Sequence, residues 1–128
     1  MEELIARIAT ASGIAPETAE KAVGLILAFL QKEGPQAEVQ ALFNAVPGAA
    51  EMAAAAADES KGGILGGLLG MMPGGGLMGL AGQLSGLGLG MGEMQAVGKE
   101  IFAHAREHAG DETVGQVAAA IPGLHQFL

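Results

Sequence analysis

The sequence contains no cysteine, tryptophan or tyrosine, and only four phenylalanines among its 128 residues. Without cysteine the chain has no disulfide, no thiol nucleophile and no cysteine-based metal site. So few aromatic rings leave almost nothing on which a nucleic acid base or a sugar could stack. Basic residues are also scarce: six Lys and Arg are scattered singly, against fourteen Asp and Glu, for a formal net charge of −8. Because a phosphate backbone is bound by clustered positive charge, we expect no nucleic acid partner.

The amino-terminal residues also lack the features of a signal peptide. The chain begins Met1-Glu2-Glu3-Leu4, which is acidic where a signal peptide is basic. The lack of cysteine is compatible with a reducing compartment. We therefore expect a cytoplasmic protein with the self-repelling acidic surface typical of soluble bacterial proteins.

The most informative feature that is present is an internal repeat with a spacing of about 75 residues. Ala45-Val46-Pro47-Gly48 closes the first copy, and Ala120-Ile121-Pro122-Gly123 closes the second. Gly13-Ile14 matches Gly88-Leu89 at the same spacing, and apolar residues inside the copies match as well. The pattern indicates two copies of one unit on either side of a Gly-rich middle. The expected segments are a first repeat at 1–57, a connecting segment at 58–79 and a second repeat at 80–128, within one compact domain.

Each copy carries apolar residues at helical spacing, interrupted by glycine and proline. Gly13 is expected to end a first helix, Pro16 to begin a long second one, and Gly34-Pro35 to separate it from a third. Each unit has one apolar face that must be buried, most simply against the other copy. The sequence thus predicts an all-α helical bundle with approximate internal two-fold symmetry. Its expected core comprises Ile8, Val23, Ile26, Leu27, Leu42, Val97, Ile101, Phe102, Val117 and Ile121.

The glycine-apolar turn, the long Ala- and Leu-rich helix and the Ala-[Val/Ile]-Pro-Gly ending together resemble two related bacterial families, domain-of-unknown-function families 2267 and 2780. Ile8 to Pro47 is more similar to the first family. The whole layout, with its Gly/Leu-rich middle leading into Leu84-Ser85-Gly86-Leu87-Gly88-Leu89, is more similar to the second. The resemblance implies an all-α fold and no established activity, and it supplies no catalytic residue.

The segment His104-Ala105-Arg106-Glu107-His108 matches the H-x-x-E-H pattern of some zinc proteases. His104 and His108 are one helical turn apart and could share a metal, with Glu107 beside them. A further carboxylate ligand well downstream is missing, and the first copy has Phe29 and Glu33 at the matching positions. Glu100 and the three motif residues lie opposite the Val97/Ile101 stripe, so we predict an ordinary solvated face. His104, Glu107 and His108 remain weak metal candidates, and His125 could approach them only if the carboxyl-terminal tail folds back.

No charged residue occurs between Gly62 and Gly92. The run is long enough for a membrane span and contains G-x-x-x-G spacings, but glycine and Pro73 weaken a helix there and no basic or aromatic belt flanks it. It has no G-K-[ST] motif either, so a phosphate-binding loop is not expected. We predict short helical pieces with Gly74-Gly75-Gly76 as a hinge, forming a partner or ligand surface of Leu65, Leu68, Leu69, Met71, Met72, Leu77, Met78 and Leu80.

These observations favour a small interaction or scaffold protein without catalytic activity. The three serines have no histidine at a fixed local spacing, and nothing else indicates an enzyme or a cofactor. We expect the partner to be a second copy of the chain or another protein. The alternatives are a module that binds an apolar ligand or a membrane surface through the middle segment and, more remotely, a metal-dependent site at His104 and His108.

Overall fold

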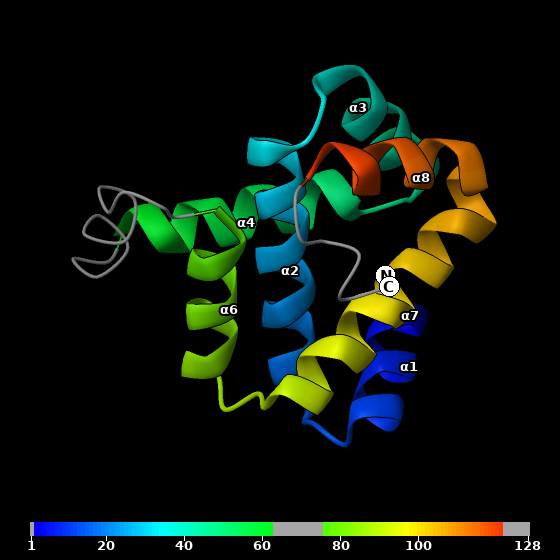
Figure 1. Ribbon diagram of the computed structural model, residues 1–128. Coiled ribbons are helices and arrows are strands. Elements are labelled where there is room, and N and C mark those ends of the chain that lie inside the picture. Colours follow the sequence, from blue (N-terminus) through cyan, green and yellow to red (C-terminus); the bar gives the residue numbers. More distant parts are fainter. Residues whose placement is uncertain (1, 63–75, 122–128) are drawn as a thin grey trace.

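The computed structural model describes the backbone of residues 2–62 and 76–121, and the side chains of residues 2–56 and 80–121. These residues are helical and contain no strand, which confirms the all-α prediction for the described part of the chain. In chain order the helices are α1 (Glu2–Ser12), α2 (Pro16–Glu33), α3 (Gln36–Ala45), α4 (Ala49–Gly62), α6 (Gly76–Gly86), α7 (Met91–Ala109) and α8 (Asp111–Ala120) (Figure 1).

Glycine and proline mark the helix ends where the sequence predicts them. Gly13 after α1 and Gly88 after α6 have φ angles of 72° and 93°, a left-handed conformation that glycine adopts without steric cost. Pro16 is the first residue of α2, where its missing N–H costs no helical hydrogen bond. Gly34 caps the end of α2, and Pro35 precedes α3. The two halves therefore enter their long helices through similar glycine turns.

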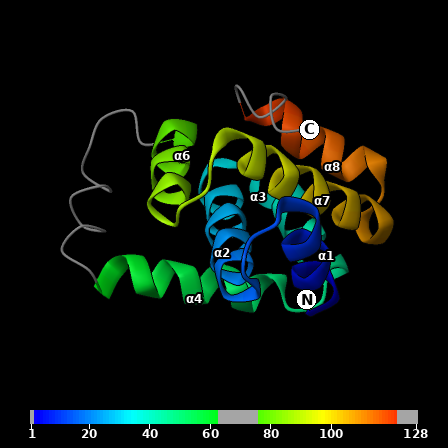
Figure 2. The ribbon, with the colours of Figure 1, turned by 90° about the horizontal axis from the view of Figure 1, so that it is seen from below.

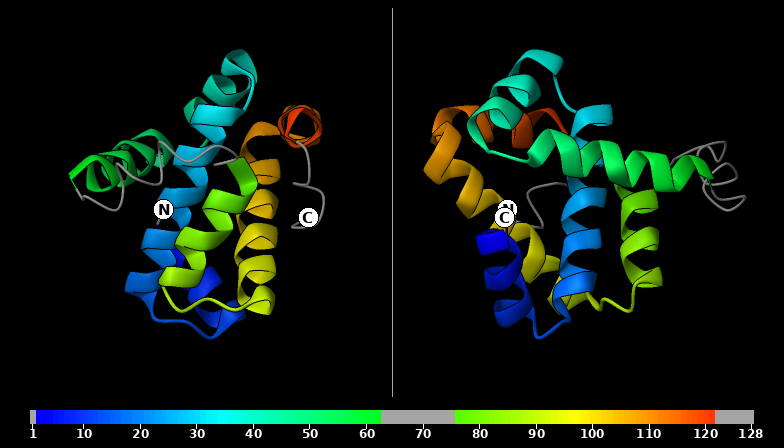
Figure 3. Two further views of the ribbon diagram at one scale, coloured as in Figure 1. Left: turned by 60° about the vertical axis from the view of Figure 1, so that its left-hand side comes forward. Right: turned by 180° about the vertical axis from the view of Figure 1, so that it is seen from behind.

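Four helices pack around the core. Helix α1 packs against α2 and α7, helix α6 packs against α2, and the long helices α2 and α7 touch each other. The α1–α2 and α6–α7 turns lie at the same end of these four helices (Figures 2 and 3). Helices α3 and α8 pack against each other at the opposite end, and α4 crosses the outer side of α2 (Figures 1 and 3).

The helix order and the helix bounds recur along the chain. Helices α2 and α7 begin at Pro16 and Met91, and α3 and α8 begin at Gln36 and Asp111, which is 75 residues apart in each pair. The helix preceding each long helix packs on the long helix of the other half: α1 on α7, and α6 on α2. Helix α4 follows the first set and has no counterpart among the described helices.

The core residues predicted from the sequence are all buried, each with at most 5% of its surface exposed. They belong to one cluster, to which Leu4 on α1 and Leu80 and Leu84 on α6 also contribute. The expected segment boundaries at 57/58 and 79/80 fall inside helices, because α4 continues to Gly62 and α6 already begins at Gly76. None of the described helices combines the length and the apolar character needed to cross a bilayer.

Candidate functional site

Helix α1 packs beside the H-x-x-E-H motif of α7, so the predicted solvated face is wrong for His104, whereas Glu107 and His108 are exposed as predicted. Helix α1 packs on α7, and Arg7 from α1 connects two carboxylates of that face. Its Nη2 atom lies 3.3 Å from Oε2 of Glu100, and its Nη1 atom lies 3.5 Å from Oε2 of Glu107. The polar residues of α7 thus flank a contact between the two halves of the chain.

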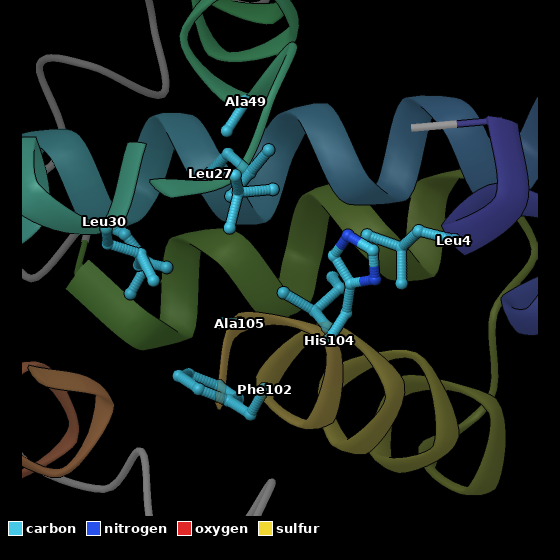
Figure 4. A pocket seen from close by; sticks show the side chains of 10 residues that line it. Leu4, Leu27, Leu30, Ala49, Phe102, His104 and Ala105 are labelled. Atoms are coloured by element: carbon cyan, nitrogen blue, oxygen red, sulfur yellow. The ribbon is translucent and has the colours of Figure 1, made fainter. Parts of the chain in front are cut away.

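His104 lies beneath this contact and is only 7% exposed, the one buried polar residue among those described. Its ring points between α7 and the opposing helices, toward Leu4 (Figure 4). It lines a cavity of about 10 Å³ whose other walls are apolar side chains. They are Leu4, Leu27, Leu30, Leu42, Val46, Ala49, Ile101, Phe102 and Ala105. The prediction that His104 is solvated is therefore corrected: α1, from the other end of the sequence, covers it.

The second histidine lies beside the first on the exposed side. The ring centroids of His104 and His108 are 4.4 Å apart, and the two ring planes are tilted by 55°. Burial lowers the pKa of His104 below its usual value, and the nearby His108 lowers it further, because both disfavour the imidazolium form. His104 is therefore held as a neutral imidazole with a second imidazole next to it.

The pair offers at most one metal-binding nitrogen from each neutral imidazole ring. Among the residues whose side chains are described, no three His, Asp or Glu side chains come close enough together to hold a metal ion as a cluster. The carboxylate of Glu107 is engaged by Arg7, although it is largely exposed. The cavity beside His104 has about the volume that a single water needs, so no substrate fits there.

The predicted partner surface is described only in part. Leu80 belongs to the core rather than to an open surface: it is 7% exposed and, with Leu84 one turn further along α6, contributes to the cluster. The side chains of Leu77 and Met78, on α6, are outside the described set. The rest of that surface, Leu65, Leu68, Leu69, Met71 and Met72, lies outside the described residues, as do Gly74 and Gly75 of the expected hinge and His125. Gly76, the last hinge residue, is the first residue of α6.

The burial of His104 was not predicted, although the residue at the matching position of the first half indicates it. Phe29 stands 75 residues earlier in the chain, at the matching position of the predicted repeat, and is also buried. A position filled by phenylalanine in one half is an apolar position, and the second half should have been expected to bury whatever residue stands there. The pattern of polar residues along α7 suggested the opposite, because Arg7 of α1 could not be located from the sequence.

Comparisons with known proteins give no match: no family model fits the chain, and no curated protein or solved structure is significantly similar to it.

Proposed function

We propose that this protein is a non-catalytic interaction or scaffold protein that self-associates, and that the Gly/Leu/Met-rich segment between its two halves makes the contact. The segment carries six large apolar residues between Ile64 and Met72 and no charge. On a chain with a net charge of −8, an uncharged apolar stretch is where a second copy meets the least electrostatic repulsion. The methionines adapt to varied packing surfaces.

One observation carries this proposal: the buried apolar side chains of the described helices belong to one cluster. Among the described residues, Met91 is the one large hydrophobic side chain that is exposed. The described helices therefore offer no large apolar surface of their own to a partner.

We further infer that the two halves are tandem copies of one helical unit. The matching bounds of α2 and α7 and of α3 and α8 support this interpretation, as do the glycine turns before both long helices. The first helix of each unit packs against the long helix of the other, which would bury the apolar face of both copies at once. The bacterial, cytoplasmic setting expected from the composition fits such an acidic protein without cysteine.

The test is the mass of the full chain in solution, measured by sizing chromatography with light scattering over a range of concentrations. We expect a multiple of the 12.7 kDa chain mass for the native sequence. Replacing Leu65, Leu68 and Leu69 together by glutamine should shift the protein to the monomer mass, because the change removes apolar contact area from the segment.

A matched control places three glutamines on an exposed face outside the segment. Ala50, Ala54 and Ala55 are exposed on α4, and their joint replacement by glutamine should leave the mass unchanged. A native chain that stays monomeric at all concentrations would refute self-association. A leucine variant that keeps the native mass would refute the assignment to the segment.

The alternative of a membrane-surface or apolar-ligand module uses the same segment and is separated by vesicle flotation. We expect the native chain to remain at the bottom of the gradient with neutral and anionic phosphatidylcholine–phosphatidylglycerol vesicles, since basic residues are scarce. Flotation that is lost in the leucine variant would favour the membrane alternative over self-association.

A further inference from the structure

The proposed function makes no use of the two histidines on α7, yet they are the most unusual chemical feature of the described fold. His104 and His108 are one turn apart, with their ring centroids 4.4 Å from each other. We propose that this pair is a two-ligand site for a divalent transition-metal cation of the kind that imidazole prefers, such as zinc or copper, with water at the remaining coordination positions.

The ring separation fits shared coordination. Imidazole nitrogens bind zinc at about 2.0–2.1 Å, which places two rings on one ion with centroids roughly 4.5–5.2 Å apart for nitrogen–metal–nitrogen angles between a right angle and a tetrahedral one. The observed 4.4 Å is within a small side-chain rotation of that range. Both side chains come from one rigid helix, so little conformational freedom is lost when the ion binds.

The pair lies at the edge of a helix–helix contact. Glu100 and Glu107 flank it on α7, and Arg7 of α1 engages both carboxylates. His108 is exposed, so an ion can reach the pair from solvent.

The first half of the chain provides an internal comparison. Phe29 and Glu33 stand where the second half has His104 and His108. Phe29 is buried and Glu33 is exposed, as expected for ordinary packing and solvation. Placing an imidazole in the apolar position costs stability unless it gains a partner. A metal ion shared with His108 is such a partner, and it accounts for both substitutions together.

The full chain, stripped with a chelator, is titrated with zinc chloride by calorimetry, and the histidine ring nitrogens are followed by NMR. We expect one ion per chain and shifts at two of the three histidines. His104→Phe, which restores the residue of the first half, and His108→Gln, an exposed change, should each weaken binding by at least about ten-fold, the smallest loss that even outer-shell changes produce. His125→Gln is the matched control and should bind as the native chain does.

A folding control separates a loss of zinc binding from a loss of structure in each variant. Circular dichroism checks that each variant keeps its helices, and His108→Gln stands on its own should His104→Phe fold poorly. Absence of saturable binding, native affinity in His108→Gln, or loss of binding in His125→Gln would each overturn the two-ligand site. Because no step involves the middle segment, the leucine variant should bind zinc normally whatever its mass in solution.

Discussion

Phe29 and His104 lie at the same position along their long helices, thirteen residues after Pro16 and Met91, and are buried to the same degree, 8% and 7% exposed. One is an apolar ring in an apolar core. The other is a polar ring whose pKa is lowered, chiefly by burial. The core therefore accepts an aromatic ring of similar size at both places, but only one of the rings has a desolvation cost.

Replacing His104 by phenylalanine should stabilise the metal-free protein. The apolar ring avoids the cost of burying an imidazole, and the adjoining cavity of about 10 Å³ gives it room. We expect the free energy of unfolding to rise by about 1 kcal/mol or more, measured by denaturant titration with a chelator present. The exposed His108→Phe change is the control and should give no such gain. A loss of stability in His104→Phe would show that the imidazole makes a contact the core depends on.

The same residue should make stability fall in mild acid. In the unfolded chain the imidazole titrates near its ordinary pKa of about 6.5, whereas burial, followed by the charge of His108, lowers the pKa of His104 in the fold. Its contribution is therefore fully present above about pH 6.5 and is lost as the pH falls toward the folded-state value. Between about pH 7.5 and pH 5.5, the free energy of unfolding obtained from thermal melts should fall more steeply for the native chain than for His104→Phe. The difference in slope should be at most about 1.4 kcal/mol per pH unit. Parallel declines would show that His104 protonates without cost.

The sequence predicts the helix ends and the core well because both depend on local signals. Gly13, Pro16 and Gly34 each act on their own turn of chain, and the apolar stripes of α2 and α7 need only the helical period to identify Ile26 and Ile101 as buried. The surroundings of His104 depend instead on which helix covers α7. That helix is α1, nearly the whole chain away, and no local pattern specifies the contact.

The burial of Leu80 was also not predicted, although here a local pattern indicates it. Its glycine-rich, uncharged neighbourhood suggested a surface for a partner, but Leu80 and Leu84 form one turn of an apolar stripe on α6 that faces the core. Composition describes a segment as a whole, whereas burial is decided residue by residue through the helical period. The stripe could have been recognised from the four-residue spacing alone.

Removing buried methyl groups at matched positions of the two long helices should cost similar amounts. Ile26 and Ile101 are 5% and 3% exposed in the same cluster. Ile26→Ala and Ile101→Ala should each lower the free energy of unfolding by about 2–5 kcal/mol, because a cavity remains where the side chain was. Met91→Ala, at a side chain that is 66% exposed, is the control and should change little. Melting temperatures near the native value for both isoleucine variants would contradict the assignment of these stripes to the core.

The crossing of α4 over α2 should be sensitive to a single methyl group at Gly24. A Cβ atom there would lie 3.1 Å from Cβ of Ala56 and 3.2 Å from the carbonyl oxygen of Met52, which is tighter than ordinary van der Waals contact, so α4 would have to shift slightly away from α2. Gly24→Ala should therefore lower the free energy of unfolding by about 1–3 kcal/mol, although alanine is the better helix former. Denaturant titration of the full chain measures the change.

Gly115 in the middle of α8 is the matched control for this crossing. A Cβ atom added there meets nothing within 4 Å, so Gly115→Ala should gain the helix propensity of alanine and raise stability by about 0.5–1 kcal/mol. The two substitutions are chemically identical and should differ in sign, because only Gly24 lies under another helix. If both substitutions stabilise the protein, α4 does not pack closely on α2. Other contacts would then hold α4 to the rest of the protein.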